Sequence, residues 1–267
     1  MARKALCVGI NDYPGDDSDL RGCVNDARAW AELLVERFSF ARGDVKLLLD
    51  GEATKANMVA SLKGLLAGAR AGDVLVFTNS SHGSYEVDRS GDEAYDEAIC
   101  PFDCDTKGLL LDDELRKLFS GLAAGASLTV ISDSCHSGSL TRAAAEAGSA
   151  GGYRRARFLS PKALGKPEVA DIEALAPRRL SKYTQADMKE LLLSGCTSRE
   201  FSWDADIAGK PHGAMTFHAI KAIRDANYRI TWEDLHKRVR SLLDVAGFDQ
   251  HPQLEGLPEN KKKLVFS

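Results

Sequence analysis

The sequence predicts an α/β protein with a mostly parallel central sheet and helices on both of its faces. Short apolar runs alternate along the chain with segments whose apolar residues recur at helical spacing. Such alternation places parallel strands in one sheet and helices against it. The length of 267 residues, with 44% hydrophobic and 28% charged residues, is typical of one globular domain with a sizeable core.

The N-terminal part of the chain supplies three predicted strands and two predicted helices. The strands are expected at Lys4–Ile10, Lys46–Leu49 and Val74–Phe77. One helix is predicted over residues 24 to 38, and Thr54 is a suitable N-cap for the other.

The C-terminal part continues the same alternation. The predicted extended segments are Glu97–Phe102, Leu128–Ile131, Leu191–Leu193 and Leu264–Phe266, the last closing the sheet. Helices are expected from Asp112 or Asp113 through Leu118, from Ala214 to Ala226, and after Thr231. No convincing strand is predicted between residues 140 and 189.

The overall charge excludes some classes of function and hides two charged segments. The net charge of −4 gives no global basic field for nucleic acid. Residues 86–114 hold eleven acidic and two basic residues, whereas residues 140–182 hold nine basic and four acidic ones. The long basic segment predicts either a functional or a disordered linker.

The sequence also predicts where the protein resides. It has no apolar run long enough for a membrane span, and its first residues do not resemble a secretory signal. Six scattered cysteines do not form a disulfide pattern. We therefore expect a cytoplasmic protein with free thiols and no membrane or nucleic-acid partner.

Two predicted strand ends carry reactive side chains. His82 and Gly83 follow one strand, and Cys135 follows another within Asp-Ser-Cys-His-Ser-Gly. Ligands of open α/β sheets bind at such carboxyl ends. An imidazole beside a thiol can take its proton and later protonate a leaving amine. The backbone N–H groups of Gly83 and Cys135 could stabilise a developing oxyanion.

Several motifs in order resemble the caspase-like cysteine peptidases, and among them the metacaspases and their prokaryotic relatives. They include VGINDY, LRGCVNDA, TNSSHGS, YDEAICPFD, DSCHSGS and SGCTSREFSWD followed by GAMTF. His82 also precedes Cys135 by 53 residues, close to the caspase spacing of about 50. Ser81 departs from the family's usual glycine. The resemblance covers nearly the whole chain outside residues 140–189.

The resemblance implies one caspase-like sandwich domain. Residues 1–139 correspond to the large subunit, 140–189 to a flexible basic linker, and 190–267 to the small subunit. It also implies that Cys135 is the nucleophile and His82 the general acid/base of an endopeptidase. A role in cell death, stress or defence is implied by resemblance alone.

The resemblance further implies an acidic specificity pocket. Asp133 and Asp26 are its expected carboxylates, lined by Cys23 and Ser80, with Trp203 at a neighbouring subsite and Asp204 as a further acid. Two carboxylates would accept a protein or peptide substrate with Arg or Lys before the cleaved bond. An alternative for Asp26 is a helix N-cap.

Two modes of activation follow from the same resemblance. Asp96, Asp112 and Asp113 correspond to Ca²⁺ ligands of some metacaspases, although they could simply cap a helix or be solvated. Five arginines of the basic linker are candidate self-cleavage sites: Arg154, Arg155, Arg157, Arg178 and Arg179. A separate regulatory protein is a third candidate trigger.

Three other functions are weighed against the peptidase. The first is a catalytically silent caspase-fold module that binds and regulates a partner, against which the intact Cys135 and His82 argue. The second is a zinc module using Cys100, Cys104, His82 and Cys135, for which Cys-x₃-Cys is a weak signal. The third is a serine hydrolase, disfavoured because Gly-x-Ser-x-Gly is absent around Ser134.

Overall fold

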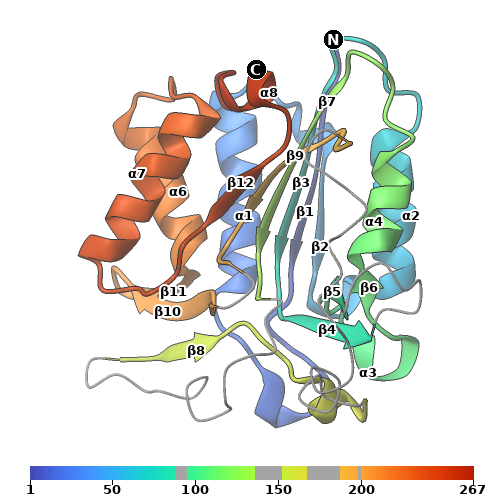
Figure 1. Ribbon diagram of the computed structural model, residues 1–267, viewed down its shortest axis with the longest axis vertical. Coiled ribbons are helices and arrows are strands. Elements are labelled where there is room, and N and C mark those ends of the chain that lie inside the picture. The colour runs from blue at the N-terminus through green and yellow to red at the C-terminus, as the bar shows by residue number, and fades with distance from the viewer. Residues whose placement is uncertain (88–94, 136–151, 167–186, 198–199) are drawn as a thin grey trace.

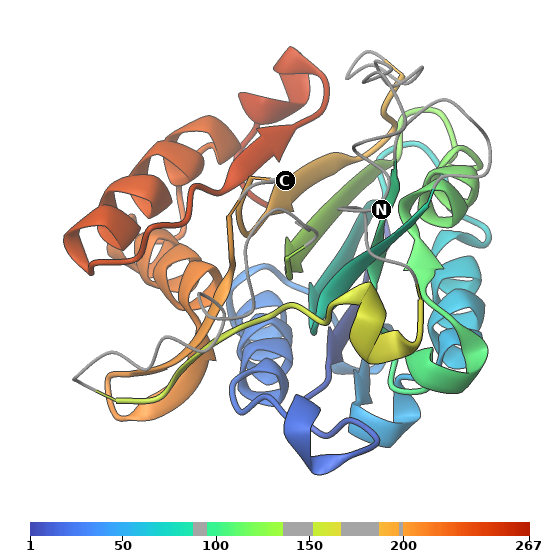
Figure 2. The same ribbon diagram turned by 60° about the horizontal axis from the view of Figure 1, so that its bottom comes forward.

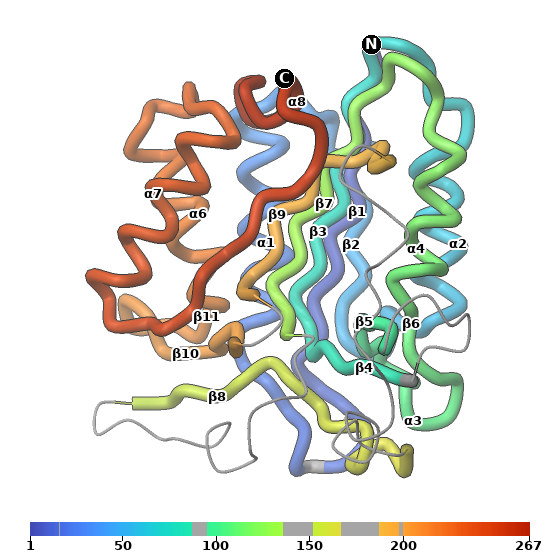
Figure 3. The backbone as a smooth tube through the Cα atoms, in the orientation of Figure 1, coloured from blue at the N-terminus to red at the C-terminus, as the bar shows by residue number. Residues whose placement is uncertain are grey.

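The structure is a computed structural model that describes residues 1–87, 95–135, 152–166, 187–197 and 200–267. Its centre is a six-stranded sheet in the order β12-β9-β7-β3-β1-β2, seen across the tube trace in Figure 3. Its strands are β1 (Arg3–Gly9), β2 (Val45–Leu49), β3 (Val74–Ser80), β7 (Ser127–Asp133), β9 (Leu191–Ser194) and β12 (Gln253–Glu255). All neighbours pair in parallel except β12, which is antiparallel to β9.

Helices cover both faces of this sheet (Figure 1). On one face lie α1 (Cys23–Arg37), α6 (Ala214–Asp225) and α7 (Trp232–Val245). On the other lie α2 (Lys55–Leu66) and α4 (Asp112–Phe119). The predicted α/β class with a mostly parallel sheet and helices on both faces is therefore confirmed. Among the described residues, no helix is both long and apolar enough to cross a membrane.

Two small sheets lie beyond the carboxyl ends of the central strands (Figure 2). One consists of β4 (Gly83–Val87), β5 (Tyr95–Ile99) and β6 (Leu110–Leu111). The other consists of β8 (Arg154–Ala156), β10 (Trp203–Ile207) and β11 (Lys210–Gly213). The short helices are α3 (Cys104–Lys107) and α8 (Pro258–Lys261), with 3₁₀ turns at Asp16–Ser18, Arg42–Asp44, Asp50–Glu52 and Pro161–Leu164.

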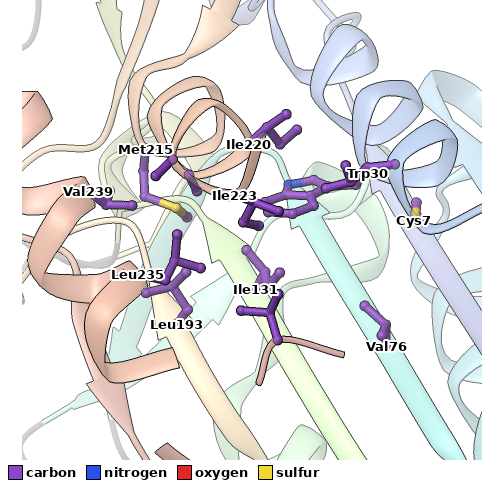
Figure 4. Close-up of a cluster of buried hydrophobic side chains, with 14 of the residues drawn as sticks. Cys7, Trp30, Val76, Ile131, Leu193, Met215, Ile220, Ile223, Leu235 and Val239 are labelled. Atoms are coloured by element: carbon purple, nitrogen blue, oxygen red, sulfur yellow. The ribbon is translucent and has the colours of Figure 1, made fainter. Parts of the chain in front are cut away.

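The core on the α1, α6 and α7 side joins early and late parts of the chain. Figure 4 shows Val76 and Ile131 of the sheet facing Trp30 of α1 and Ile223 of α6. Leu193 of β9 packs in the same cluster. Burial of these apolar side chains fixes the register of β3 against β7, which determines where their carboxyl ends lie.

Two predictions made for the strands are wrong. Leu264–Phe266 does not close the sheet: Leu264 forms an isolated bridge with Thr231, and Phe266 packs against Trp30 and Trp232. The sheet edge is instead β12. The second error is β8, a strand inside the 140–189 segment, where none was predicted because its arginines give no apolar pattern.

Candidate active site

The register of β3 and β7 brings the two predicted reactive residues to one edge of the sheet. Ser80 pairs with Asp133 at the ends of these parallel strands. His82 lies two residues beyond Ser80, and Cys135 lies two residues beyond Asp133. Both side chains are fully buried, so the chemistry would take place away from bulk water.

Local contacts fix the tautomer of His82. Its Nε2 lies 2.7 Å from the carbonyl oxygen of Ser18. A carbonyl oxygen only accepts, so Nε2 carries the proton and Nδ1 has a free lone pair. Nδ1 is buried without a hydrogen-bond partner. Burial lowers the pKa of His82 to about 3, which the hydrogen bond to Ser18 partly opposes.

Tyr13 contacts both the backbone and the ring of His82. The Tyr13 hydroxyl accepts a hydrogen bond from the His82 backbone N–H at 3.1 Å and donates to the carbonyl of Cys100 at 3.0 Å. The Tyr13 and His82 rings are 5.1 Å apart. This role of Tyr13 was not predicted from the sequence, although VGINDY was noted as a family motif.

The Cys135 thiol contacts the backbone of Ser202. Its Sγ accepts a hydrogen bond from the Ser202 N–H at 2.6 Å and lies 3.3 Å from the Ser202 carbonyl oxygen. Cys196 is a close neighbour, and its pKa is raised by the Cys135 thiol and by burial. In the described part of the chain, no hydrogen bond joins Cys135 Sγ to the His82 ring, because Nδ1 has no partner and Nε2 lies against the Ser18 carbonyl oxygen.

The main chain of Arg157 lies against the two predicted oxyanion donors. Its carbonyl oxygen accepts hydrogen bonds from the N–H groups of Gly83 at 2.9 Å and of Cys135 at 3.2 Å. The Arg157 N–H donates to the Ser202 carbonyl at 2.9 Å. The preceding strand β8 pairs antiparallel with β10 (Figure 2). The Arg157 backbone is thus held through both its N–H group and its carbonyl oxygen.

The guanidinium of Arg157 is fully buried among three carboxylates. Its Nη2 lies 2.7 Å from Asp26 Oδ2 and 2.9 Å from Asp204 Oδ1. Its Nη1 lies 3.5 Å from Asp133 Oδ2 and donates to the Asp133 carbonyl oxygen at 3.0 Å. Burial lowers the pKa of Arg157, but Cys23 and the three carboxylates outweigh it and hold that pKa well above its ordinary value.

Asp26 lies inside α1 rather than at its start. The N-cap of α1 is Gly22, so the alternative interpretation of Asp26 as an N-cap is wrong. Besides Arg157, the Asp26 carboxylate accepts from the Gly213 N–H at 2.9 Å and from the Ser80 hydroxyl at 3.3 Å. His212 Nδ1 lies 3.1 Å away. Burial raises the pKa of Asp26, and Arg157 opposes that rise.

Cys23 and Asp204 lie near the same guanidinium, whereas Trp203 lies in the β8–β10 pair beside it. Cys23 is buried, and its pKa is raised by desolvation and sensitive to the charges of Arg157 and the three aspartates. Asp204 also accepts from the Arg21 N–H at 2.7 Å and from the Tyr153 hydroxyl at 2.8 Å. Trp203 stands opposite Ala156 in the β8–β10 pair.

Two residues of the pocket were missed by the sequence analysis. A Cβ on Gly213 would lie 2.5 Å from Arg157 Nη1, so only glycine leaves room for the guanidinium. Ser202 holds Cys135 and the Arg157 backbone, and its hydroxyl donates to Asp133. Both residues lie in quoted motifs, but a glycine and a serine carry no chemical signal until their neighbours are known.

The candidate self-cleavage arginines are distributed differently. Arg157 alone of the three described ones enters the acidic pocket. The guanidinium of Arg155 donates to the Asp17 carbonyl oxygen, and that of Arg154 lies over Trp203. Arg178 and Arg179 lie outside the described residues.

The three predicted calcium ligands lie together. One carboxylate oxygen from each of Asp96, Asp112 and Asp113 lies within 4.8 Å of the others. Asp112 Oδ1 is buried and has no hydrogen-bond partner. Arg116 pairs with Asp112, and its Nη1 lies 3.2 Å from Asp113 Oδ1. Carboxylate oxygens are ligands that a calcium ion prefers. An ion could bind the three aspartates if Arg116 moved away from Asp112 and Asp113.

The alternative zinc set is not assembled. Within the part of the chain that the structure describes, the aspartate triad is the one group of three or more side chains placed to hold a metal. Cys100 and Cys104 share a thiol–thiol hydrogen bond that lowers the pKa of Cys104. Neither is grouped with His82 or Cys135.

Comparisons with known proteins found several similar chains. Residues 3–143 match the family model described as "Metacaspase, peptidase C14 domain". Metacaspase-1A of Neurospora crassa is 34% identical over 94% of this chain and 62% of its own length. For Metacaspase-1 of Cryptococcus neoformans the values are 34%, 99% and 64%. The chain thus spans slightly less than two thirds of these relatives.

A further relative and a solved structure extend the likeness. Metacaspase-1 of Pyricularia oryzae is 33% identical over 94% of this chain and 71% of its own length. The crystal structure of a Geobacter sulfurreducens protein, 26% identical, matches 100% of this chain and 99% of its own with a TM-score of 0.74.

Proposed function

Because this chain belongs to the metacaspase family of C14 peptidases, we propose that it is a cysteine endopeptidase that cleaves after Arg or Lys. The observation that supports the proposal is the set of contacts made by Arg157. Its carbonyl oxygen accepts from the Gly83 and Cys135 N–H groups while its guanidinium lies among three buried carboxylates.

In this proposal Cys135 and His82 act on the carbonyl carbon of the basic residue. His82 Nδ1 takes the thiol proton, and Cys135 Sγ attacks the carbonyl carbon. The Gly83 and Cys135 N–H groups stabilise the oxyanion. The intermediate collapses with loss of the amine, which receives the proton from His82. Water then hydrolyses the thioester and restores the thiol.

The specificity for a basic side chain follows from charge and from shape. Asp26, Asp133 and Asp204 together offer a fully buried anionic site, where an unpaired carboxylate is costly. A substrate carboxylate would be repelled there. The planar fork of a guanidinium satisfies several acceptors at once, whereas a lysine ammonium does so as a point charge.

The position of Arg157 suggests that the uncut chain is its own first substrate. We propose that the bond between Arg157 and Phe158 is cleaved by Cys135. Until then Arg157 fills the pocket that another substrate would need. The guanidinium, with no exposed surface, blocks entry of a second basic side chain.

We propose calcium as the trigger for this cleavage. Asp96, Asp112 and Asp113 would supply carboxylate ligands, and the ion would neutralise a cluster that Arg116 now balances. The cluster belongs to β5 and α4, and β5 pairs with β4, which begins at the oxyanion donor Gly83. Ion binding could thereby be transmitted to the site.

A peptide assay tests the proposed activity. The purified chain, incubated with calcium, should hydrolyse a fluorogenic arginyl peptide and leave the matching aspartyl peptide intact. Cys135→Ala should abolish turnover, whereas Cys7→Ala, which removes another buried thiol from the core side of β1, should keep it. Retained hydrolysis after Cys135→Ala, or no hydrolysis by the wild-type chain, would contradict the proposal.

A further inference from the structure

The side chain of Arg154 occupies a second site, three residues before Arg157 in the same segment. Its guanidinium carbon lies 4.3 Å from the centre of the Trp203 ring and 4.6 Å from that of Phe248. Contact with two aromatic faces at this distance is the geometry of a cation–π interaction. The side chain is only 18% exposed, which strengthens such contacts by excluding water.

Polar acceptors complete the site around Arg154. One guanidinium nitrogen lies 3.2 Å from Asp249 Oδ1, and the other donates to the Gly247 carbonyl oxygen at 3.2 Å. The Trp203 indole N–H also donates to Asp249 Oδ1, at 3.2 Å. The Trp203 side chain therefore orients the Asp249 carboxylate and also contacts the Arg154 guanidinium with its ring face.

The groups that form this site belong to the body of the enzyme and not to the bound segment. Trp203 is the first residue of β10, and its N–H donates to the buried Gln250 at 3.1 Å. Phe248 follows α7, and its N–H donates to the Leu243 carbonyl at 3.0 Å. The site would therefore persist after the segment that carries Arg154 had left.

The intervening backbone is held as a peptide substrate would be. Ala156, Arg155 and Arg154 pair in antiparallel register with Trp203, Asp204 and Ala205. Any extended peptide with its basic residue in the acidic pocket could add to β10 in the same register. Its residue three positions earlier, the P4 residue, would then lie where Arg154 lies.

We propose that Trp203, Phe248 and Asp249 form a subsite that selects a basic P4 residue. The preferred substrates would then carry Arg or Lys both before the cleaved bond and three positions earlier. The inference rests on the proposed peptidase function. It goes further by naming a double-basic substrate class and a recognition element made of two rings and one carboxylate.

Three fluorogenic peptides test the subsite: acetyl-Arg-Arg-Ala-Arg, acetyl-Ala-Arg-Ala-Arg and acetyl-Glu-Arg-Ala-Arg amides of one fluorophore. With the full chain incubated with calcium, as in the assay above, we expect kcat/KM to be about tenfold higher for P4 Arg than for P4 Ala. The kcat/KM for the peptide with P4 Glu should be lower still because the Asp249 carboxylate would repel the glutamate. Asp249→Asn, which keeps an acceptor for the Trp203 indole, and Phe248→Leu should each lower the Arg-to-Ala ratio several-fold.

A matched control is Asp244→Asn, which makes the same charge change at an exposed position on α7. It should leave the ratio at its wild-type value. Equal kcat/KM for the three peptides, or a ratio unchanged by Asp249→Asn and Phe248→Leu, would overturn the subsite while the peptidase stands. No turnover of any of the peptides would overturn the proposed function and the subsite with it.

Discussion

Gly213 shows how a single missing side chain shapes the acidic pocket. Its backbone is in an ordinary extended conformation, with φ at −68°, so alanine would be tolerated by the main chain. A methyl group there would nevertheless lie 2.5 Å from Arg157 Nη1 and 2.7 Å from its Cζ, and would also meet Asp133. The aspartates thus give the pocket its negative charge, and Gly213 leaves the space that the guanidinium occupies.

We predict that Gly213→Ala lowers kcat/KM for an arginyl peptide by about 100-fold or more, equivalent to roughly 3 kcal/mol of lost binding. Gly64→Ala, which meets open space on α2, is the matched control and should keep wild-type activity. Circular dichroism of both variants establishes that they fold. A folded Gly213→Ala protein with normal turnover would show that the guanidinium is not bound where Arg157 lies.

His82 couples the site to the stability of the whole chain through its protonation. Its pKa is about 3 in the folded chain, below its ordinary value of 6.5, because burial disfavours the imidazolium. Between these values the unfolded chain binds a proton that the folded chain does not. The stability contributed by neutral His82 is therefore present above pH 6.5 and is lost as the pH falls toward 3.

We predict that acidification lowers the free energy of unfolding more in the chain that has His82 than in a variant that lacks this imidazole. Both proteins carry Cys135→Ala to keep the chain intact. Between pH 6 and pH 4 the free energy of unfolding of the parent should fall by about 1 kcal/mol per pH unit more than that of His82→Asn. Urea titrations measure this difference, and parallel pH profiles would show that His82 is not buried as a neutral group.

At the scale of elements, the apolar pattern predicted the strands that form the sheet interior. Val74–Phe77 is a continuous apolar run and Leu128–Ile131 is interrupted only by Thr129, and they form β3 and β7, with helices on both sides. The prediction failed at β8 and β12, whose stability comes from pairing with β10 and β9 rather than from their own composition. Leu264–Phe266 is apolar enough for a strand, but its Phe266 packs against Trp30 and Trp232 instead.

The candidate site was predictable to the extent that its residues carry chemistry. Cys135, His82 and the three pocket aspartates were identified from motifs. The hydrogen bonds from Ser202, the support from Tyr13 and the space beside Gly213 depend on chain segments that meet only in the fold. Arg157 was one of five linker arginines, and nothing local distinguished it from Arg154 or Arg155.

The first turn of α4 carries two aspartates that suit the start of the helix and also belong to the proposed calcium cluster. Asp112 and Asp113 suit a helix N-terminus, where negative charge is favourable, and they also group with Asp96. Arg116, one turn later, pairs with Asp112 and Asp113, so its positive charge already balances part of this cluster. A bound calcium ion would therefore compete with Arg116.

We predict that Arg116→Gln tightens calcium binding by about three- to tenfold, since it removes this competing charge. Asp112→Asn should weaken it by a similar or greater factor. Lys117→Gln is the matched control, with the same loss of charge on the same helix. Calorimetric titration of the Cys135→Ala chain measures all four proteins. Weaker binding by Arg116→Gln, or no binding by the parent, would contradict a calcium site at this cluster.

At the scale of the whole molecule, the segments before and after Arg157 are interlocked. β9 and β12 complete the sheet begun by β1, β2, β3 and β7, and the core shared by α1 and α6 draws residues from both segments (Figure 4). A cut after Arg157 would leave these contacts in place. Cleavage would therefore leave the fold intact while it removes the covalent link between Arg157 and Phe158.

The mass of the denatured protein, measured with and without calcium, tests whether the chain cuts itself after Arg157. We predict that calcium converts the wild-type chain into fragments ending at Arg157 and beginning at Phe158. Cys135→Ala should stay whole, and Arg155→Ala should be cut at the same bond. A wild-type chain that stays intact, a first cut elsewhere, or an Arg157–Phe158 cut in Cys135→Ala would contradict self-cleavage by Cys135.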